Sequence, residues 1–263
     1  MLDVVRSLGG EVPWVPLGQC RAIHVRQPTR KWETDMADIG HGYGSEWHLL
    51  RFLGRHREHL GAAIQRLIGC DTVSWLDFPF DPKNKKWKDV EWKGLDFLPQ
   101  ESAARGKWAE FWPQTGRPPN WDAVGQVSVN GRREWLLVEA KAHLGEIESS
   151  CQASPAGGLN TIRAAFEITK KALGVQPDRD WLSGYYQFCN RMAVLHFLNS
   201  HDVPARLLFL YFTGDEFPDG SVHCPTSEDG WRLALAKQAE HVGLPDGHAL
   251  SSRIHKLFLP VCS

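Results

Sequence analysis

Two acidic residues and a lysine flank a short turn signal in the middle of the chain. Asp122 precedes the dipeptide Asn130-Gly131, and Glu139 and Lys141 follow it. Asn-Gly is favoured in two-residue type I′ hairpin turns. Carboxylate oxygens suit Mg²⁺ or Mn²⁺, and such an ion polarises a phosphate oxygen and lowers the pKa of a bound water. These residue types are therefore the ones that metal-dependent hydrolysis of a phosphodiester bond needs.

The turn also predicts how these side chains are arranged. A two-residue turn at Asn130-Gly131 places Asp122 directly opposite Glu139, with Cβ atoms about 5 Å apart. Side chains alternate between the two faces of a strand, so Lys141 shares the face of Glu139. We therefore expect two carboxylates and one ammonium at the open end of the hairpin. A β-bulge would break this register, and bulges occur near active sites.

The other face of the predicted hairpin is small or apolar. Apart from Glu134 near the turn it carries Ala123, Gly125, Val127, Val129, Leu136, Val138 and Ala140. Such a face packs against a helix, which would anchor the charged trio from below. The plain alternative is a surface ladder of ion pairs formed by Asp122, Glu139 and Lys141 on an edge hairpin.

The segment WDAVGQV…REWLLVEAKAH resembles the D…ExK signature of the PD-(D/E)XK nuclease superfamily, which has the restriction-endonuclease-like fold. In that family the acid opens the second core strand and ExK closes the third. The resemblance spans about residues 44–213 by element order. Trp121 stands where the motif's name calls for proline, and we assign no chemical role to that proline. A second ExK at Glu91 follows a polar, strongly basic segment, so we set it aside.

The resemblance implies a fold and a set of roles. The fold would be α/β, a mixed central β-sheet flanked by helices with an αβββαβ core. Asp122 and Glu139 would bind Mg²⁺ or Mn²⁺, with Glu46 as a third ligand from the helix before the sheet. Lys141 would assist the attacking water or stabilise the transition state, and Gln187 and Arg191 would support the site from a later helix.

Two predicted helices carry the supporting residues. Apolar residues recur at helical spacing over residues 45–68, and Glu46 lies in the first turn, beside the apolar stripe. Glu46 is equally well explained as an acid that the helix dipole favours. Residues 180–199 form a second, mostly apolar helix on which Gln187 and Arg191 lie four apart. Gln187 could reach the site and Arg191 could contact a phosphate, or both could belong to a polar network that supports the fold.

The remaining pattern predicts one domain over residues 1–263. We expect strands at 72–78, 121–129, 132–142, 207–212 and 255–261, and further helices at 159–173 and 230–242. Residues 79–119 are rich in Lys, Trp, Gly and Pro and are too long for a simple connection, so we treat them as an insertion.

Composition sets limits on location and partners. The formal net charge is −1, so overall charge does not point to nucleic acid, although Lys83, Lys85, Lys86, Lys88 and Lys93 form one basic cluster. The six cysteines include no CxxC pair and are read as reduced thiols. Without a signal sequence or a membrane span, a cytoplasmic protein is expected.

These residues are compatible with three functions. The first is a Mg²⁺-dependent nuclease, with DNA as the expected substrate and a homodimer as one arrangement that the resemblance allows. The second is a catalytically inactive module of the same fold that binds nucleic acid or protein. The third uses the two carboxylates as a glycosidase acid and base, and Lys141 beside them argues against it.

Overall fold

The Asn130-Gly131 turn lies at the centre of the observed sheet. The computed structural model describes residues 42–77, 80–81, 86–87, 91–116 and 118–261. Asn130 and Gly131 both have positive φ, 51° and 74°, as a type I′ turn requires. Strands β6 (Ala123–Val129) and β7 (Arg132–Lys141) are antiparallel on either side of it. Their register runs from Val129 opposite Arg132 to Ala123 opposite Val138, which confirms the predicted hairpin over that length.

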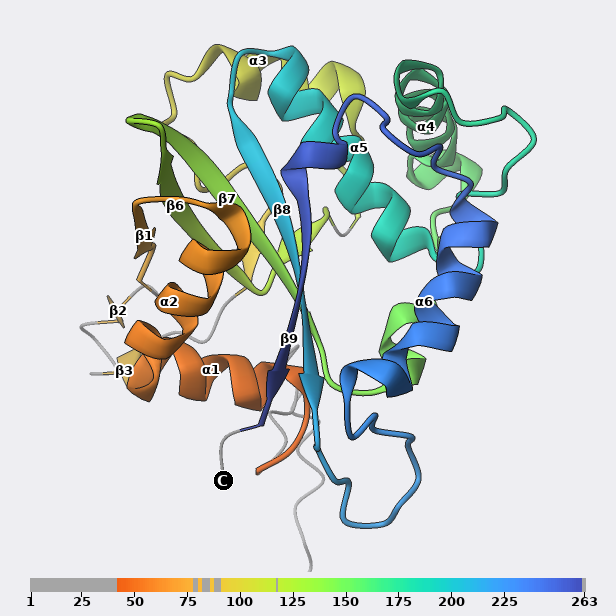
Figure 1. The fold of residues 1–263 in the computed structure, drawn as a ribbon. Helices are drawn as coiled ribbons and strands as arrows, with labels where there is room; N and C mark the ends of the chain where they lie inside the picture. The colour runs from red at the N-terminus through yellow and green to blue at the C-terminus, as the bar shows by residue number, and fades with distance from the viewer. Residues whose placement is uncertain (1–41, 78–79, 82–85, 88–90, 117, 262–263) are drawn as a thin grey trace, which may run out of the picture. The chain divides into compact units, whose positions relative to one another are not determined.

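Three more strands complete a five-stranded mixed sheet of order β1-β6-β7-β8-β9 (Figure 1). β1 (Thr72–Trp75) is antiparallel to β6. β8 (Ala205–Thr213) is parallel to β7, and β9 (Ile254–Pro260) is parallel to β8. The expectation of an α/β fold with a mixed central sheet flanked by helices is confirmed. The hairpin is interior to the sheet, so the alternative of an edge hairpin is wrong.

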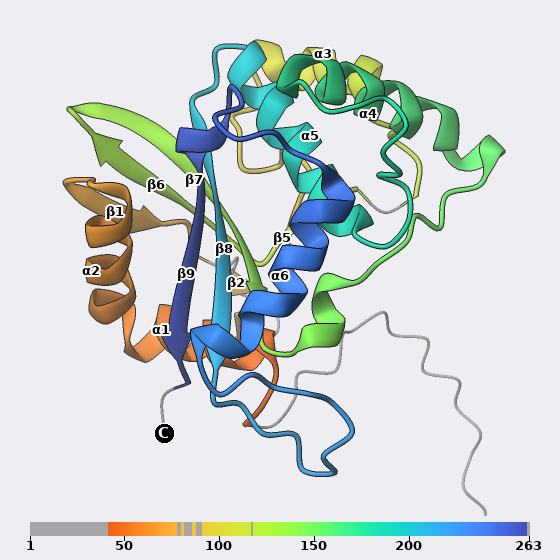
Figure 2. The same cartoon turned by 45° about the vertical axis from the view of Figure 1, so that its right-hand side comes forward.

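Helices cover the two faces of the sheet (Figures 1 and 2). α1 (Ser45–Arg55) and α2 (Arg57–Ile68) lie on one face. α3 (Ala103–Phe111), α4 (Leu159–Leu173), α5 (Tyr186–Ser200) and α6 (Glu228–Val242) contribute to the core on the other. The helix predicted over 45–68 is two helices, because the backbone leaves helical geometry at His56 (φ −119°, ψ 28°).

The small, apolar face of the hairpin packs as predicted. Ala123, Val127, Leu136, Val138 and Ala140 are buried with side chains of α1 and α2. Glu134, the one charge expected there, is buried near the turn, where Arg206 Nε lies 2.5 Å and Arg253 Nη1 3.2 Å from its Oε2. Pairing with two guanidinium groups accounts for a buried acid at the edge of an apolar layer.

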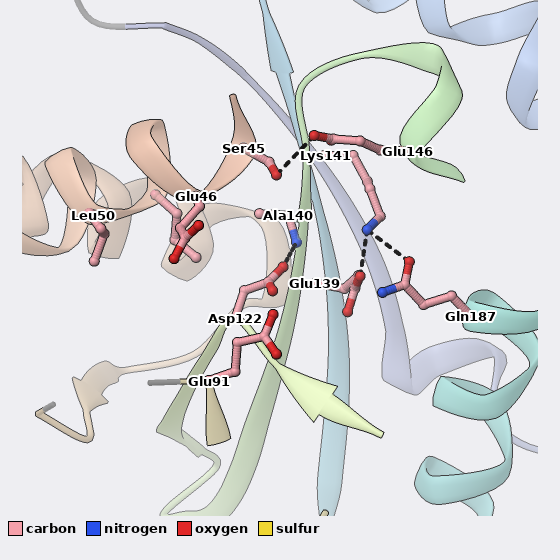
Figure 3. A pocket seen from close by; sticks show the side chains of 11 residues that line it. Ser45, Glu46, Leu50, Glu91, Asp122, Glu139, Ala140, Lys141, Glu146 and Gln187 are labelled. Carbon is pink, nitrogen blue, oxygen red and sulfur yellow. Dashed lines mark hydrogen bonds and ion pairs between the residues drawn. The ribbon is translucent and has the colours of Figure 1, made fainter. Parts of the chain in front are cut away.

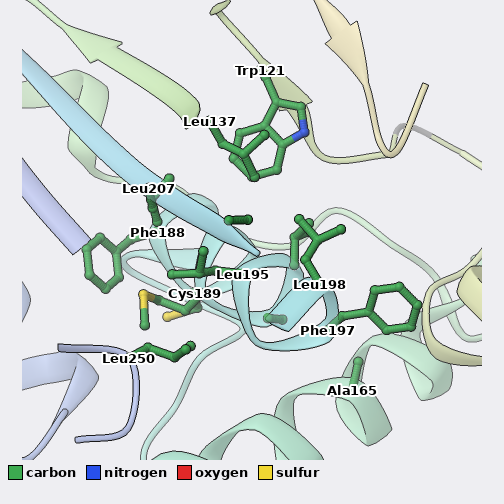
Figure 4. Packing of buried hydrophobic residues seen from close by; sticks show 14 of the residues in the cluster. Trp121, Leu137, Ala165, Phe188, Cys189, Leu195, Phe197, Leu198, Leu207 and Leu250 are labelled. Atoms are coloured by element: carbon green, nitrogen blue, oxygen red, sulfur yellow. The ribbon is translucent and has the colours of Figure 1, made fainter. Parts of the chain in front are cut away.

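The second core lies between the sheet and α3 to α6. Trp121 and Leu137 face α5, whose Cys189, Leu195 and Leu198 fill the layer (Figure 4). The predicted insertion contributes to this core through α3, with Trp108 and Trp112 both buried. Within the described residues the insertion also holds β4 (Trp92–Lys93), which pairs with β5 (Asn120–Trp121), and the two-residue strands β2 (Phe80–Asp81) and β3 (Lys86–Trp87).

Several element boundaries differ from the expectation. The helix expected over 180–199 begins at Tyr186, because the Asp180 carboxylate accepts from the backbone N–H groups of Leu182 and Ser183 and holds a turn there. The strand expected over 72–78 ends at Trp75, and α3 was not predicted. Lys83, Lys85 and Lys88 lie outside the described residues, as do residues 1–41. None of the described helices is long and apolar enough to cross a bilayer.

Candidate active site

Glu139 and Lys141 lie at the end of β7, on the face that α5 covers (Figure 3). Lys141 Nζ donates to Glu139 Oε1 at 2.6 Å and to Gln187 Oε1 at 2.9 Å. Gln187 is in turn fixed by its backbone N–H, which donates to Ser149 Oγ at 2.8 Å. The structure therefore brings together Glu139, Lys141 and Gln187 as predicted, and the lysine ammonium is held between two acceptors.

Asp122 reaches the site through a kink in the chain. The regular ladder ends at Ala123 and Val138, and Asp122 forms a bend between β5 and β6. Its N–H donates to Val138 O at 3.1 Å, and its Oδ2 accepts from Ala140 N at 2.6 Å. The predicted backbone pairing of Asp122 with Glu139 is therefore wrong. The bend occurs because the carboxylate takes the place of a main-chain acceptor, and Asp122 still lines the same pocket as Glu139.

Glu139 forms a buried ion pair with Arg191. Its side chain is 1% exposed, and both Nε and Nη2 of Arg191 lie 2.7 Å from Oε2. The Arg191 guanidinium also donates to Asn190 Oδ1 at 2.7 Å, and its Cζ lies 4.9 Å from the centroid of the Trp121 ring. Arg191 is 3% exposed and lines no part of the pocket. This geometry favours a role in positioning Glu139 over the phosphate contact expected from the sequence.

The pocket is a cavity of about 220 Å³ with an acidic lining (Figure 3). Asp122, Glu139, Lys141, Gln187 and the predicted helix acid Glu46 all line it. Two further acids, Glu91 and Glu146, also line it and were not predicted. Glu91 belongs to the ExK that we set aside as a motif. Glu146 follows β7 in a 3₁₀ turn, and no spacing in the sequence marks it.

Hydrogen bonds hold the N-terminus of α1, which carries Glu46, against this pocket. Glu146 Oε2 accepts from Ala142 N at 2.6 Å, and Ser45 Oγ donates to Glu146 Oε1 at 3.2 Å. Behind it, His48 Nε2 lies 2.9 Å from Asp215 Oδ1, while Gly44 N donates to Asp215 Oδ2 at 2.9 Å. His48 and Asp215 are 3% and 5% exposed. The first turn of α1 is thus fixed to the ends of both β7 and β8.

The two central acids have opposite electrostatic environments. Burial, and then the negative charge of Glu139, raise the pKa of Asp122 to about 8. Burial also opposes ionisation of Glu139, yet Arg191 and Lys141 outweigh it and lower the pKa of that carboxyl. The pKa of Lys141 is raised by Glu139 and Asp122 against its own burial. Without a further cation, Asp122 holds a proton near neutral pH while Glu139 is ionised.

These donors fit a hard divalent cation. The pocket offers carboxylate oxygens from Asp122 and Glu139, and burial together with the charge of Glu139 raises the pKa of Asp122, an effect that a bound cation would oppose. Within the described part of the chain, no group of three or more His, Cys, Asp or Glu side chains could hold a metal ion as it stands. Mg²⁺ commonly takes one or two carboxylates and fills its octahedral shell with water and substrate phosphate, so Asp122 and Glu139 are the residues that would hold it.

Comparison with known proteins adds nothing to this assignment. No family model, no curated protein and no solved structure matches the chain. The chemistry of the site is therefore argued from its own residues.

Proposed function

We propose that this protein is a Mg²⁺-dependent nuclease that hydrolyses phosphodiester bonds, with DNA as its substrate. The observation that carries the proposal is the cluster of Asp122, Glu139 and Lys141 in one pocket at the end of a buried hairpin. The order helix, β1, β6, β7, helix, β8 also supports a restriction-endonuclease-like αβββαβ core. Both points agree with the resemblance of the D…ExK segment to the PD-(D/E)XK superfamily.

Each residue has a role that follows from its position. Asp122 and Glu139, with Glu46 from α1, would supply the carboxylate oxygens for the metal ion. When bound, that ion would polarise the phosphate and lower the pKa of the attacking water. Of the described residues that line the pocket, Lys141 is the one cation, so its ammonium can orient the water or offset charge that builds on the phosphate oxygens. Gln187 holds Lys141, and Arg191 holds Glu139 from below.

The raised pKa of Asp122 and the lowered pKa of Glu139 would fit a glycosidase, but the contacts of Glu139 argue against that function. A pair of carboxyls with one raised and one lowered pKa is what that chemistry uses. Glu139, however, has Oε1 bonded to Lys141 and Oε2 to Arg191, and it is 1% exposed. A carboxylate whose charge is shared with two cations is a weak nucleophile and a weak base toward a sugar, although Oε1, which accepts from Lys141 alone, keeps a lone pair for a metal ion.

The decisive experiment separates catalysis from metal binding. Purified protein is tested for Mg²⁺-dependent cleavage of labelled single- and double-stranded DNA and of RNA, beside Lys141→Met and Asp122→Ala. We expect Lys141→Met to lower kcat at least about 100-fold. Asp122→Ala should abolish both cleavage and the Mg²⁺ binding measured by calorimetry with a DNA duplex present. Lys171→Met, which replaces an exposed lysine on α4, is the matched control.

Two results would overturn the proposal. Wild-type protein that binds Mg²⁺ and cleaves no nucleic acid would refute nuclease activity. Wild-type protein that binds nucleic acid without taking up a divalent ion would support the inactive binding module. Cleavage that survives Lys141→Met would leave the nuclease but reject this mechanism.

A further inference from the structure

A second cavity, of about 250 Å³, lies at the end of β4. Lys93 and Arg105 line it together with Asp96, Trp108 and Gln114. Among the described residues, this lining has two cations and one acid beside an indole and an amide, whereas the first pocket has five acids and one lysine. The two cavities therefore suit different parts of one anionic substrate.

The segment around β4 connects the two cavities. Glu91 lines the first and Lys93 the second. Two residues of extended chain span about 7 Å, and alternation places Glu91 and Lys93 on the same face of the strand. Trp92, between them, packs against the hydrophobic core. A ligand that extends out of the first pocket along this face would reach Lys93.

The wall of the second cavity is fixed to the strand that delivers Asp122. Gly94 N donates to Pro119 O at 2.7 Å, and Trp121 Nε1 donates to Gly94 O at 2.9 Å. Trp121, the residue before Asp122, is fully buried. The spacing between the second cavity and Asp122 is therefore set by buried hydrogen bonds.

Charge provides the reason for such a site. A phosphodiester chain carries a negative charge at every nucleotide, so phosphates beside the scissile one would be repelled by Glu91 and Glu146. Lys93 is exposed, and no acidic side chain among the described residues pairs with it. Arg105, in contrast, is held by Asp96 at 3.3 Å and by the carbonyl oxygens of Leu95 and Leu98. Lys93 is thus the cation available to a neighbouring phosphate.

We propose that this cavity binds a nucleotide that flanks the scissile phosphate, with the flanking phosphate on Lys93 and the base beside Gln114. The amide of Gln114 is exposed and can hydrogen-bond to a base, whereas Trp108 is buried against Trp112 and Phe197 and offers no free ring face for stacking. The inference rests on the proposed function, because it assigns the second cavity to the same substrate.

The test measures binding of a fluorescein-labelled 12-nucleotide single-stranded DNA by anisotropy, with Ca²⁺ in place of Mg²⁺ to prevent turnover. Lys93→Ala is compared with Lys107→Ala, which removes an exposed lysine of α3 that does not line the cavity. We expect Lys93→Ala to weaken binding about three- to tenfold and to reduce the slope of log Kd against log salt by about 0.7. Lys93→Arg should restore most of the affinity, and Lys107→Ala should behave as wild type.

The outcomes distinguish this inference from the proposed function. Equal effects of Lys93→Ala and Lys107→Ala, in a protein whose wild type cleaves DNA, would overturn the flanking site and leave the nuclease. A wild-type protein that neither binds nor cleaves the DNA would overturn both. A loss confined to Lys93→Ala, with rescue by Lys93→Arg, would support the site.

Discussion

At the scale of single residues, the charge state of Glu139 depends on Arg191. Arg191 contacts Glu139, Asn190 and the ring of Trp121, so one buried guanidinium joins α5, the end of β7 and the residue before Asp122. Trp121 stands where the name of the PD-(D/E)XK motif has proline, a residue to which we assign no chemical role. The structure shows that Trp121 at this position forms the surface on which Arg191 lies.

Removing Arg191 should be costly to stability. Arg191→Met would leave Glu139 buried with Lys141 as its remaining cation. Breaking one side of a buried ion pair costs about 3–5 kcal/mol of unfolding free energy, and we expect a loss of that order in urea denaturation. Adding Glu139→Gln to Arg191→Met should recover part of the loss, because the buried carboxylate that lost its guanidinium is then neutral, while the Lys141 ammonium keeps Gln187 Oε1 as an acceptor. Additive effects of the two substitutions would contradict the coupling.

At the scale of elements, the pairing of β1 with β6 depends on a close contact between Gly125 and the neighbouring strand. Gly125 of β6 lies opposite Trp75 of β1, and a Cβ there would fall 2.6 Å from Ser74 O and 3.1 Å from the Trp75 ring. The glycine lets the indole lie over the strand that leads to Asp122. Gly61 in α2 has the opposite surroundings, since nothing lies within 4 Å of the Cβ it would carry.

These two glycines provide a matched pair of substitutions. Gly125→Ala should lower the free energy of unfolding by about 1–3 kcal/mol, because backbone would have to move to admit the methyl group. Gly61→Ala should raise it by about 0.5–1 kcal/mol, because alanine restricts the unfolded chain and favours the helix. Both changes in unfolding free energy can be read from the midpoints of urea denaturation, provided that the variants and wild type have the same m-value. A neutral Gly125→Ala would show that β1 can shift away from β6 at little cost.

At the scale of the whole molecule, the site should make global stability depend on pH and on Mg²⁺. Asp122 has a pKa of about 8 in the folded protein and about 4 when unfolded. Between these values the folded state retains a proton that the unfolded state has lost, so this contribution to stability falls as pH rises through the window. His196, His248 and His255 have lowered pKa values and act in the opposite direction, but only below about pH 6.5.

The metal-free protein should therefore lose up to about 2 kcal/mol of stability between pH 6.5 and 8, relative to Asp122→Asn. Mg²⁺ competes with the proton on Asp122, so it should stabilise wild type more at pH 8 than at pH 6.5 and should stabilise Asp122→Asn little at either. Thermal denaturation of both proteins at pH 6.5 and pH 8, with and without about 10 mM Mg²⁺, measures the stabilisation that Mg²⁺ provides. Parallel pH profiles for the two proteins would contradict a raised Asp122 pKa.

The local parts of this arrangement could be predicted from the order of residues along the chain. Asn130-Gly131 fixed the hairpin and its register up to Ala123 and Val138, because turn geometry and strand alternation act over a few residues. The same alternation put Glu139 and Lys141 on one face and the apolar residues on the other. Helix periodicity located Glu46 and Gln187, although not the break at His56 or the late start of α5 at Tyr186.

The groups that meet at the site from distant parts of the chain could not be predicted, because packing of the layers brings them together. Arg191 reaches Glu139 across 52 residues of sequence, and Glu91 arrives from the second ExK, which its polar, basic surroundings led us to set aside. The kink at Asp122 depends on its carboxylate accepting from Ala140 N, which occurs only once both strands are in place. Such contacts follow from how whole layers pack, and neither periodicity nor spacing along the chain encodes that packing.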